Sequence, residues 1–358
     1  MDKLQFTCQL IDWHRFHNKR QLPWKEEADP YKIWLSEIIL QQTRAGMALK
    51  YYEAFISTYP TVTDLANAPE EEVFKLWEGL GYYSRCRNLL ATARFIATEL
   101  KGIFPSSYEN ILALKGVGPY TAAAIASFGF HLPYAVVDGN VFRVLSRCFG
   151  ISTPIDGTEG KKIFTSLANE VLDKKEPARY NQAIMDFGAT VCKPVSPLCK
   201  ECPLQKGCDA YLSGTVNELP VKAKLKARRD RWFTYFVFEV DDKTLVHQRA
   251  QKDIWLQLHE FYLVETESNK YWKEEDVYTY LDNQFGVVKP DIRYISPQIS
   301  QQLTHQTVYA TFIKVKLSSI PDTLQHYNWI NKEELQQLAF PKIINEYLQS
   351  LSFPASLF

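Results

Sequence analysis

Apolar side chains recur with a helical period through the first 215 residues of this 358-residue chain. Asp29-Pro30 is typical of a helix start, because Asp caps the first turn and Pro is tolerated at its first position. The same period returns in four later segments, at residues 63–76, 83–100, 121–128 and 160–172. No long alternating segment interrupts them, so the pattern predicts an all-helical domain over residues 1–215.

The pattern changes in the last third of the chain. Aromatic and β-branched residues predict strands at residues 233–240 and 309–317. A helical period appears at residues 274–285 and 332–348. The sequence therefore predicts a second, α+β domain over residues 232–358.

A basic stretch separates the two predicted domains over residues 216–231. Pro220 precedes its positive residues, which are Lys222, Lys224, Lys226, Arg228, Arg229 and Arg231. We expect a linker that is either a solvated tether or lies along nucleic-acid phosphates. The chain as a whole has a formal net charge of zero, so any attraction to nucleic acid must come from such a local patch.

The sequence favours an intracellular location. Charged and aromatic residues follow Met1 where a secretory signal would be apolar. The uncharged stretch 116–137 contains Pro119, Gly129, His131 and Pro133, which favours a buried helix with loops over a membrane span. We expect a cytoplasmic, DNA-associated monomer, in which clustered cysteines bind metal rather than form disulfides.

Four cysteines lie close together with the spacing C-x6-C-x2-C-x5-C, at Cys192, Cys199, Cys202 and Cys208. Converging thiolates require a soft metal or a cluster. A structural zinc site is the alternative, but it usually uses two close pairs, and only Cys199 and Cys202 form one here. The spacing favours a 4Fe–4S cluster. The loop also contains Lys193, Lys200 and Lys206, which we expect to face phosphates.

Residues 114–122 read Leu-Lys-Gly-Val-Gly-Pro-Tyr-Thr-Ala between two predicted helices. Gly116 and Gly118 permit a tight hairpin, and the free N–H groups of the next helix suit a phosphate oxygen. This is the helix-hairpin-helix pattern, expected over about residues 110–125. An Asp-Gly-Asn-Val turn at residues 138–141 follows it, and together the two motifs are far more specific than either alone.

These motifs, in this order, resemble the MutY family of adenine DNA glycosylases within the endonuclease III superfamily. The resemblance covers nearly the whole chain, and its most specific segments are residues 22–24, 30–37, 41–43, 79–85, 181–183, 185–188 and the four cysteines. It implies a DNA repair enzyme that removes adenine mispaired with 8-oxoguanine or G from duplex DNA. It also implies a Nudix-like second domain that recognises 8-oxoguanine.

Two carboxylates suit the hydrolysis of an N-glycosidic bond, because one protonates the leaving base and the other stabilises the cationic sugar. Glu37 lies in an apolar helix, where desolvation favours its protonated form. The resemblance matches Glu37 to the family's general acid. It matches Asp138 to the carboxylate that stabilises the cation or captures it covalently, with Tyr120 and Asn140 as supporting hydrogen-bond partners.

Tyr120 also predicts a monofunctional glycosylase with little or no lyase activity. Bifunctional relatives carry at this position a Lys whose amine attacks the sugar, and Tyr cannot form a Schiff base. The resemblance further places Leu22, Trp24, Lys25 and Gln182 around the extruded base. Gln42 and Tyr82 match wedge residues that fill the gap left by base flipping.

The second domain lacks the Nudix box, so nucleoside-diphosphate hydrolysis is not expected. The family's Phe-Ser-His loop, which reads 8-oxoguanine, aligns with Leu303, Thr304 and His305. Two alternatives stay open. One is an endonuclease III-like glycosylase for oxidised pyrimidines, which Tyr120 and the second domain argue against. The other is a non-catalytic DNA-binding protein, which the Glu37 and Asp138 pair argues against.

Overall fold

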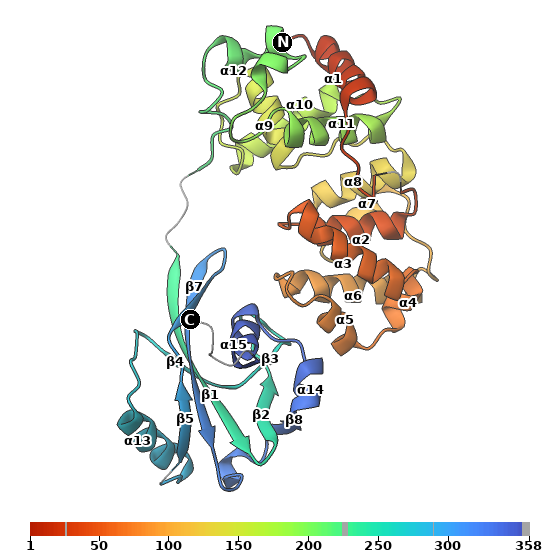
Figure 1. Ribbon diagram of the computed structural model, residues 1–358. Helices are drawn as coiled ribbons and strands as arrows, with labels where there is room; N and C mark the ends of the chain where they lie inside the picture. Colours follow the sequence, from red (N-terminus) through yellow and green to blue (C-terminus); the bar gives the residue numbers. More distant parts are fainter. Residues whose placement is uncertain (26, 224–227, 289, 353–358) are drawn as a thin grey trace. The chain divides into compact units, whose positions relative to one another are not determined.

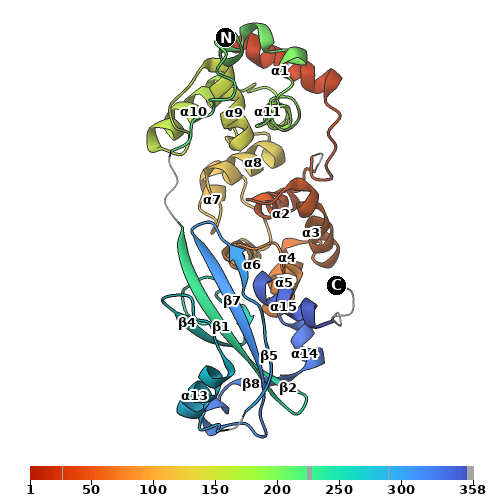
Figure 2. The same ribbon diagram turned by 60° about the vertical axis from the view of Figure 1, so that its left-hand side comes forward.

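The computed structural model describes residues 1–25, 27–223, 228–288 and 290–352. It divides into two compact units: unit 1 comprises Met1–Ala68 and Arg87–Leu225, and unit 2 comprises Pro69–Cys86 and Lys226–Phe358. Unit 1 is helical and unit 2 contains the sheet, which confirms the predicted fold class (Figures 1 and 2). In the described residues, no helix has both the length and the apolar character needed to cross a membrane.

Unit 1 is built from two groups of helices. The first contains α2 (Pro30–Leu40), α3 (Ala45–Thr58), α4 (Val62–Asn67), α7 (Tyr108–Leu112), α8 (Pro119–Phe130) and most of α6 (Tyr83–Thr98). The second contains α1 (Lys3–His17), α9 (Gly139–Phe149), α10 (Thr158–Val171), α11 (Pro177–Thr190) and α12 (Asp209–Leu212). α8 contacts both α2 and α11, so it joins the two groups.

The helix α2 begins as the sequence predicts. The Asp29 side chain accepts a hydrogen bond from the Tyr31 N–H at 2.9 Å, and Pro30 is the first helical residue. Every residue from Tyr31 to Ile39 except Lys32 is buried, so α2 lies in the interior of unit 1 rather than on its surface. A glutamate in such a helix is desolvated by its neighbours.

Two glycines permit close approaches that position the site. Gly116, in the hairpin before α8, has φ +81°, and an added Cβ would lie 2.7 Å from Asn88 Cβ. Gly188 of α11 faces the start of α9, where an added Cβ would lie 2.6 Å from Asn140 Cβ. α9 and α11 therefore pack closely where the Asp-Gly-Asn turn begins.

Unit 2 has a central pair of long parallel strands, β1 (Arg229–Val240) and β7 (Gln306–Lys316). β2 (Lys243–Gln248) and β4 (Tyr262–Thr266) pair with β1, β5 (Asp291–Ile295) and β6 (Ile299–Gln302) pair with β7, and β3 (His259–Glu260) and β8 (Asn328–Asn331) pair with β2. Alternate β1 side chains pack against α15 (Lys342–Ser352) on one face and α13 (Glu274–Phe285) on the other.

Several predicted boundaries differ in the structure. The helix expected over 63–76 is two helices, α4 and α5 (Glu70–Leu76), because Pro69 cannot continue a hydrogen-bonded turn. α5 belongs to unit 2 although it lies within the predicted helical domain. The helix expected over 332–348 is likewise two helices, α14 (Lys332–Gln337) and α15, with Pro341 between them.

The predicted basic linker also ends earlier than expected. β1 begins at Arg229, and Arg231 is buried in unit 2, where it forms ion pairs with Asp253 at 2.8 Å and Glu265 at 2.7 Å. Arg231 is therefore a structural residue of the sheet rather than part of a phosphate-facing tether. Lys224 and Lys226 of the same stretch lie outside the described residues.

Candidate active site

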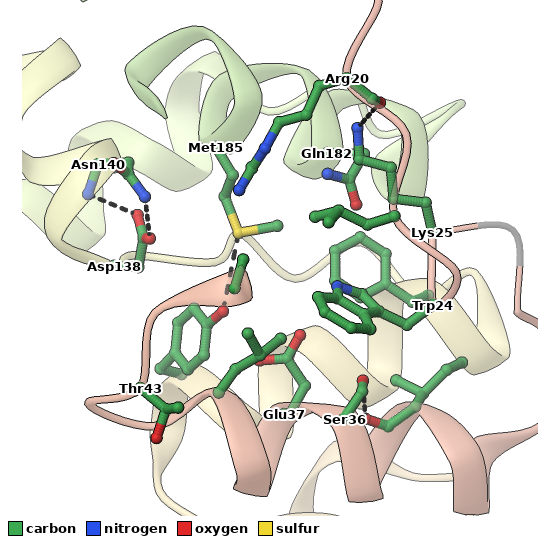
Figure 3. A pocket seen from close by; sticks show the side chains of 16 residues that line it. Arg20, Trp24, Lys25, Ser36, Glu37, Thr43, Asp138, Asn140, Gln182 and Met185 are labelled. Atoms are coloured by element: carbon green, nitrogen blue, oxygen red, sulfur yellow. Dashed lines mark hydrogen bonds between the residues drawn. The ribbon is translucent and has the colours of Figure 1, made fainter. Parts of the chain in front are cut away.

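A cavity of about 240 Å³ lies in unit 1 between the two groups of helices, where α2 and α8 face α9 and α11 (Figure 3). Its wall also includes the segment that connects α1 to α2. Eight of the residues predicted from sequence line it together: Leu22, Trp24, Lys25, Glu37, Tyr120, Asp138, Asn140 and Gln182. The structure thus brings both predicted carboxylates and four predicted base-pocket residues into one site.

Glu37 lies on α2 with only 5% of its surface exposed, and its side chain points into the cavity (Figure 3). Burial raises the pKa of Glu37 to about 7, the charge of Asp138 adds to this rise, and a hydrogen bond with the Tyr120 hydroxyl opposes it. Its Oε2 has no hydrogen-bond partner among the described residues. A carboxyl group that is about half protonated at pH 7 can donate a proton to a bound base.

Asp138 caps the N-terminus of α9. Its Oδ1 accepts hydrogen bonds from the N–H groups of Asn140 and Val141, both at 2.8 Å, and its Oδ2 accepts one from Asn140 Nδ2 at 2.7 Å. Burial raises the pKa of Asp138, while these donors oppose the rise. Because both carboxylate oxygens of Asp138 accept hydrogen bonds, the surrounding donors favour its ionised form. Asp138 can therefore present negative charge to the cavity.

Tyr120 lies in the first turn of α8, beside Glu37. Its hydroxyl is 3.7 Å from Met185 Sδ, on the facing wall of the cavity (Figure 3). Burial and the nearby carboxylates hold the pKa of Tyr120 well above its usual value, so the phenol remains a neutral donor. The side chain thus bridges the Glu37 wall and the α11 wall.

The predicted phosphate-binding hairpin lies outside this cavity, between α7 and α8. Gly118 is the N-cap residue of α8 and has no side chain to cap the helix. The first-turn N–H groups and the positive end of the helix dipole are therefore the features that α8 offers to an anion. Thr92 supports the hairpin by donating to the Lys115 carbonyl at 2.9 Å.

The cysteine loop follows α11 and also lies in unit 1. One small cavity is lined by all four predicted ligands: Cys192, Cys199, Cys202 and Cys208. Arg147 and Cys148 of α9 line it too, and Arg147 NH1 is 3.5 Å from Cys192 Sγ. A hydrogen bond from Cys148 lowers the pKa of Cys208 to about 7. In the described ranges, no three His, Cys, Asp or Glu side chains are grouped to hold a single metal ion.

Known proteins show where this architecture belongs. Residues 35–170 match the model of the HhH-GPD superfamily base excision DNA repair proteins, and residues 234–350 match the NUDIX domain. An adenine DNA glycosylase of Buchnera aphidicola subsp. Baizongia pistaciae (strain Bp) is 29% identical over 98% of both chains. That of Mus musculus is 44% identical over 61% of this chain and 45% of its own length. The chain belongs to the MutY family of adenine DNA glycosylases.

Solved structures agree with the family at the level of the fold. A thermostable thymine-DNA glycosylase aligns with a TM-score of 0.55 and 31% identity, over 59% of this chain and 97% of its own. An endonuclease III–DNA complex aligns with a TM-score of 0.52 and 22% identity, over 60% of this chain and 98% of its own. Both cover only about the helical part, so the second domain sets this MutY-family chain apart from them.

The predicted wedge residues share an unusual backbone conformation. Gln42 has φ 56° and Tyr82 has φ 48°, values that are uncommon for residues other than glycine. Tyr82 is 45% exposed. In unit 2 its hydroxyl lies 2.7 Å from Thr304 Oγ1, so the structure brings together a predicted wedge and the predicted 8-oxoguanine loop.

That loop is the turn between β6 and β7. Thr304 and His305 are exposed, whereas Leu303 packs against the hydrophobic core of the sheet. Leu303 therefore has a packing role, and Thr304 and His305 are the exposed residues of the turn.

Sequence reasoning missed several residues that the fold brings to the site. Arg20 and Met185 line the cavity beside the predicted residues. Arg143 of α9 is buried and donates to Asn140 Oδ1 at 2.8 Å and to the Cys192 carbonyl at 2.7 Å, so it connects the Asp138 turn to the cysteine loop. The spacing of Arg143, Arg147 and Cys148 on one helix was the available signal, because two arginines one turn apart would share a face.

Proposed function

We propose that this protein is a monofunctional DNA glycosylase that releases adenine opposite 8-oxoguanine or guanine in duplex DNA. The reaction is acid-assisted hydrolysis of the N-glycosidic bond, as a step of base excision repair. The observation that carries the proposal is the occurrence in one cavity of Glu37, which burial keeps partly protonated, and Asp138, whose oxygens both accept hydrogen bonds. Family membership supports adenine as the base.

The two carboxyl groups divide the chemistry between them. Adenine extruded from the duplex enters the cavity, and Glu37 transfers its proton to the leaving base while the electron pair of the C–N bond goes with the base. The positive charge that develops on the sugar is stabilised by Asp138, through its charge alone or through a covalent bond. A water molecule completes the hydrolysis by adding to the sugar and returning a proton to Glu37.

Tyr120 supports the monofunctional assignment, because a phenol cannot form a Schiff base with the sugar. Lys25 is the lysine that lines the cavity, and its ammonium group forms an ion pair with Asp186 at 2.5 Å. An amine that is engaged in this way is charged and is a poor nucleophile. We therefore expect the product to be an intact strand that carries an abasic site.

Several elements outside the cavity are suited to hold the DNA. The hairpin at Gly116 and Gly118 offers N–H groups to one backbone phosphate, and the lysines of the cysteine loop add positive charge. The donor set of that loop, four cysteines around one cavity, fits a 4Fe–4S cluster. When bound, the cluster supplies a rigid, cross-linked loop rather than redox chemistry, because hydrolysis transfers no electrons.

Unit 2 supports recognition of the opposite base. The exposed Thr304 hydroxyl is held by Tyr82, and it is the polar group that this turn offers to a damaged purine beside His305. Replacement of Thr304 by Val keeps the shape of the side chain and removes the hydroxyl. We expect T304V to lower the preference for 8-oxoguanine over guanine, while adenine release opposite guanine changes little.

The decisive experiment is a single-turnover glycosylase assay on one duplex sequence with different pairs. The arms are A opposite 8-oxoguanine, A opposite G, T opposite G, thymine glycol and undamaged DNA. We expect release of adenine only, fastest opposite 8-oxoguanine, with strand breaks appearing only after alkali treatment. Release of thymine glycol or thymine would assign a different substrate, and nicking without alkali would contradict the monofunctional mechanism.

A further inference from the structure

Asp186 is a buried carboxylate beside the cavity that the mechanism above does not use. It lies on α11 and has 0% of its surface exposed. Three side chains from the segment after α1 donate to it: Asn18 Nδ2 at 2.7 Å and Lys25 Nζ at 2.5 Å to Oδ2, and Arg20 NH1 at 2.8 Å to Oδ1. One carboxylate therefore receives donors from a stretch of residues 18–25 about 160 positions away in sequence.

The segment 18–25 forms one wall of the cavity although it contains neither a helix nor a strand. Its contribution to the wall is Arg20, Leu22, Trp24 and Lys25. The facing wall includes Gln182 and Met185 of α11. Asp186 follows Met185 directly and lies one helical turn after Gln182. Asp186 thus connects the segment 18–25 to α11 beside the cavity.

The segment is also organised around this anchor. Asn18 Oδ1 accepts a hydrogen bond from the Arg20 N–H at 3.1 Å while its Nδ2 donates to Asp186. Lys25 Nζ donates to the Arg20 carbonyl as well as to Asp186. Because a segment without regular structure has few backbone hydrogen bonds of its own, these contacts determine its placement. An amide in place of the carboxylate would not match two cations and a further donor.

We propose that Asp186 is a positioning residue for the adenine pocket. It fixes Arg20, Trp24 and Lys25 relative to Gln182 and Met185, and so sets how the extruded base lies in front of Glu37. The inference rests on the proposed function, because it takes the wall formed by residues 18–25 to bind adenine. Asp186 itself does not line the cavity and acts through Arg20 and Lys25.

The test compares D186N, Lys25→Met, the double variant and a matched control, Glu170→Gln. Glu170 pairs with Lys3 and so also joins the N-terminal part of unit 1 to a later helix, but this ion pair is exposed and lies outside the cavity. Two quantities are measured for each full-length, cluster-containing protein. One is the single-turnover rate of adenine release with saturating enzyme, and the other is hydrogen exchange of the backbone amides of residues 18–25.

We expect D186N to release adenine about 10- to 100-fold more slowly, since small misplacements of a bound group have effects of this size. Duplex affinity should change less than about threefold, because the phosphate contacts that dominate it are elsewhere. Exchange should accelerate in residues 18–25 and not across unit 1. The double variant should be no slower than D186N, because both changes break the same interaction. E170Q should match the wild type in both measurements.

Three outcomes would overturn the inference: a D186N rate within twofold of wild type, rate losses that multiply in the double variant, or faster exchange throughout unit 1. If D186N does not fold, the same two measurements on Lys25→Met test the inference. In that variant Asp186 keeps Arg20 and Asn18 as hydrogen-bond partners, so the buried carboxylate is not left unpaired. A wild-type protein that releases no adenine would refute the proposed function. Hydrogen exchange alone would then test the role of Asp186. Unchanged protection of the amides of residues 18–25 in D186N would refute the claim that Asp186 anchors this segment.

Discussion

Raising the pH should slow base release progressively through the titration of one buried group, Glu37. Burial raises the pKa of Glu37 from 4.5 to about 7, and with 5% exposure solvent screening is small. At pH 7 an ordinary glutamate would be about 0.3% protonated, whereas Glu37 is about half protonated. The environment therefore increases the reactive fraction by roughly 150-fold, which corresponds to about 3 kcal/mol.

The sign of the pH effect follows from the role of a general acid. Only protonated Glu37 donates, so the rate should be constant well below pH 7 and fall about tenfold per pH unit above it. Between pH 7 and pH 9 we expect a loss of about 50-fold. The assay is adenine release with enzyme in excess. Subsaturating enzyme reports the pKa of the free protein and saturating enzyme that of the complex, with duplex affinity measured at each pH.

Tyr120→Phe provides the matched test of the cause. The Tyr120 hydroxyl lowers the pKa of Glu37, so its removal should move the alkaline limb of the profile to higher pH, whatever happens to the maximal rate. A rate that is flat from pH 6 to pH 9 would refute the general-acid assignment. A limb that moves to lower pH in Y120F would refute the proposed electrostatics while leaving the acid in place.

Three further predictions test stability, packing and the cofactor. The pKa of Glu37 in the folded state lies above its ordinary value, so the folded protein loses stability as the pH rises from about 4.5 to about 7. In guanidinium unfolding, Glu37→Gln should therefore be more stable than wild type by up to about 3 kcal/mol at pH 8. The two proteins should be equally stable near pH 4.5. Gly188→Ala should cost about 1–3 kcal/mol and slow adenine release, because its Cβ would approach Asn140 Cβ at 2.6 Å. Gly46→Ala, where an added Cβ meets nothing within 4 Å, should be neutral or slightly stabilising in the same measurement. Purified protein should contain about four iron and four sulfide per chain, and Cys199→Ser should lose them; one zinc per chain would instead indicate a structural zinc site.

The helices were predictable where start signals and period agreed. The Asp29-Pro30 start of α2 and the span of α13 were found from sequence. The errors lie at prolines within a continuing helical period, Pro69 and Pro341, where the backbone breaks although the apolar pattern does not. The assignment of α5 to unit 2 was not predictable, because it depends on contacts between residues about 260 positions apart in the sequence.

The candidate site likewise contains residues that sequence motifs identify and residues that only the fold brings together. Glu37, Asp138 and the cysteine loop lie in short motifs whose spacing carries the chemistry, so sequence was sufficient to select them. Cys148 lies more than forty residues before the cysteine loop in sequence, yet the packing of α9 against α11 and α12 brings it to the cavity of that loop. Asp186 was visible only as part of a matching motif. Its partners in 18–25 become evident only when the chain is folded.

Two carboxyl groups share one cavity, and their local structures hold them in different states. Burial raises the pKa of both, but at Glu37 a single phenol hydroxyl opposes the rise, whereas at Asp138 two backbone N–H groups and one side-chain amide do so. Glu37 lies in the middle of a buried helix, where backbone N–H groups are already engaged, and Asp138 lies at a helix N-terminus, where they are not. The assignment of acid and anion thus follows from where each residue stands on its helix.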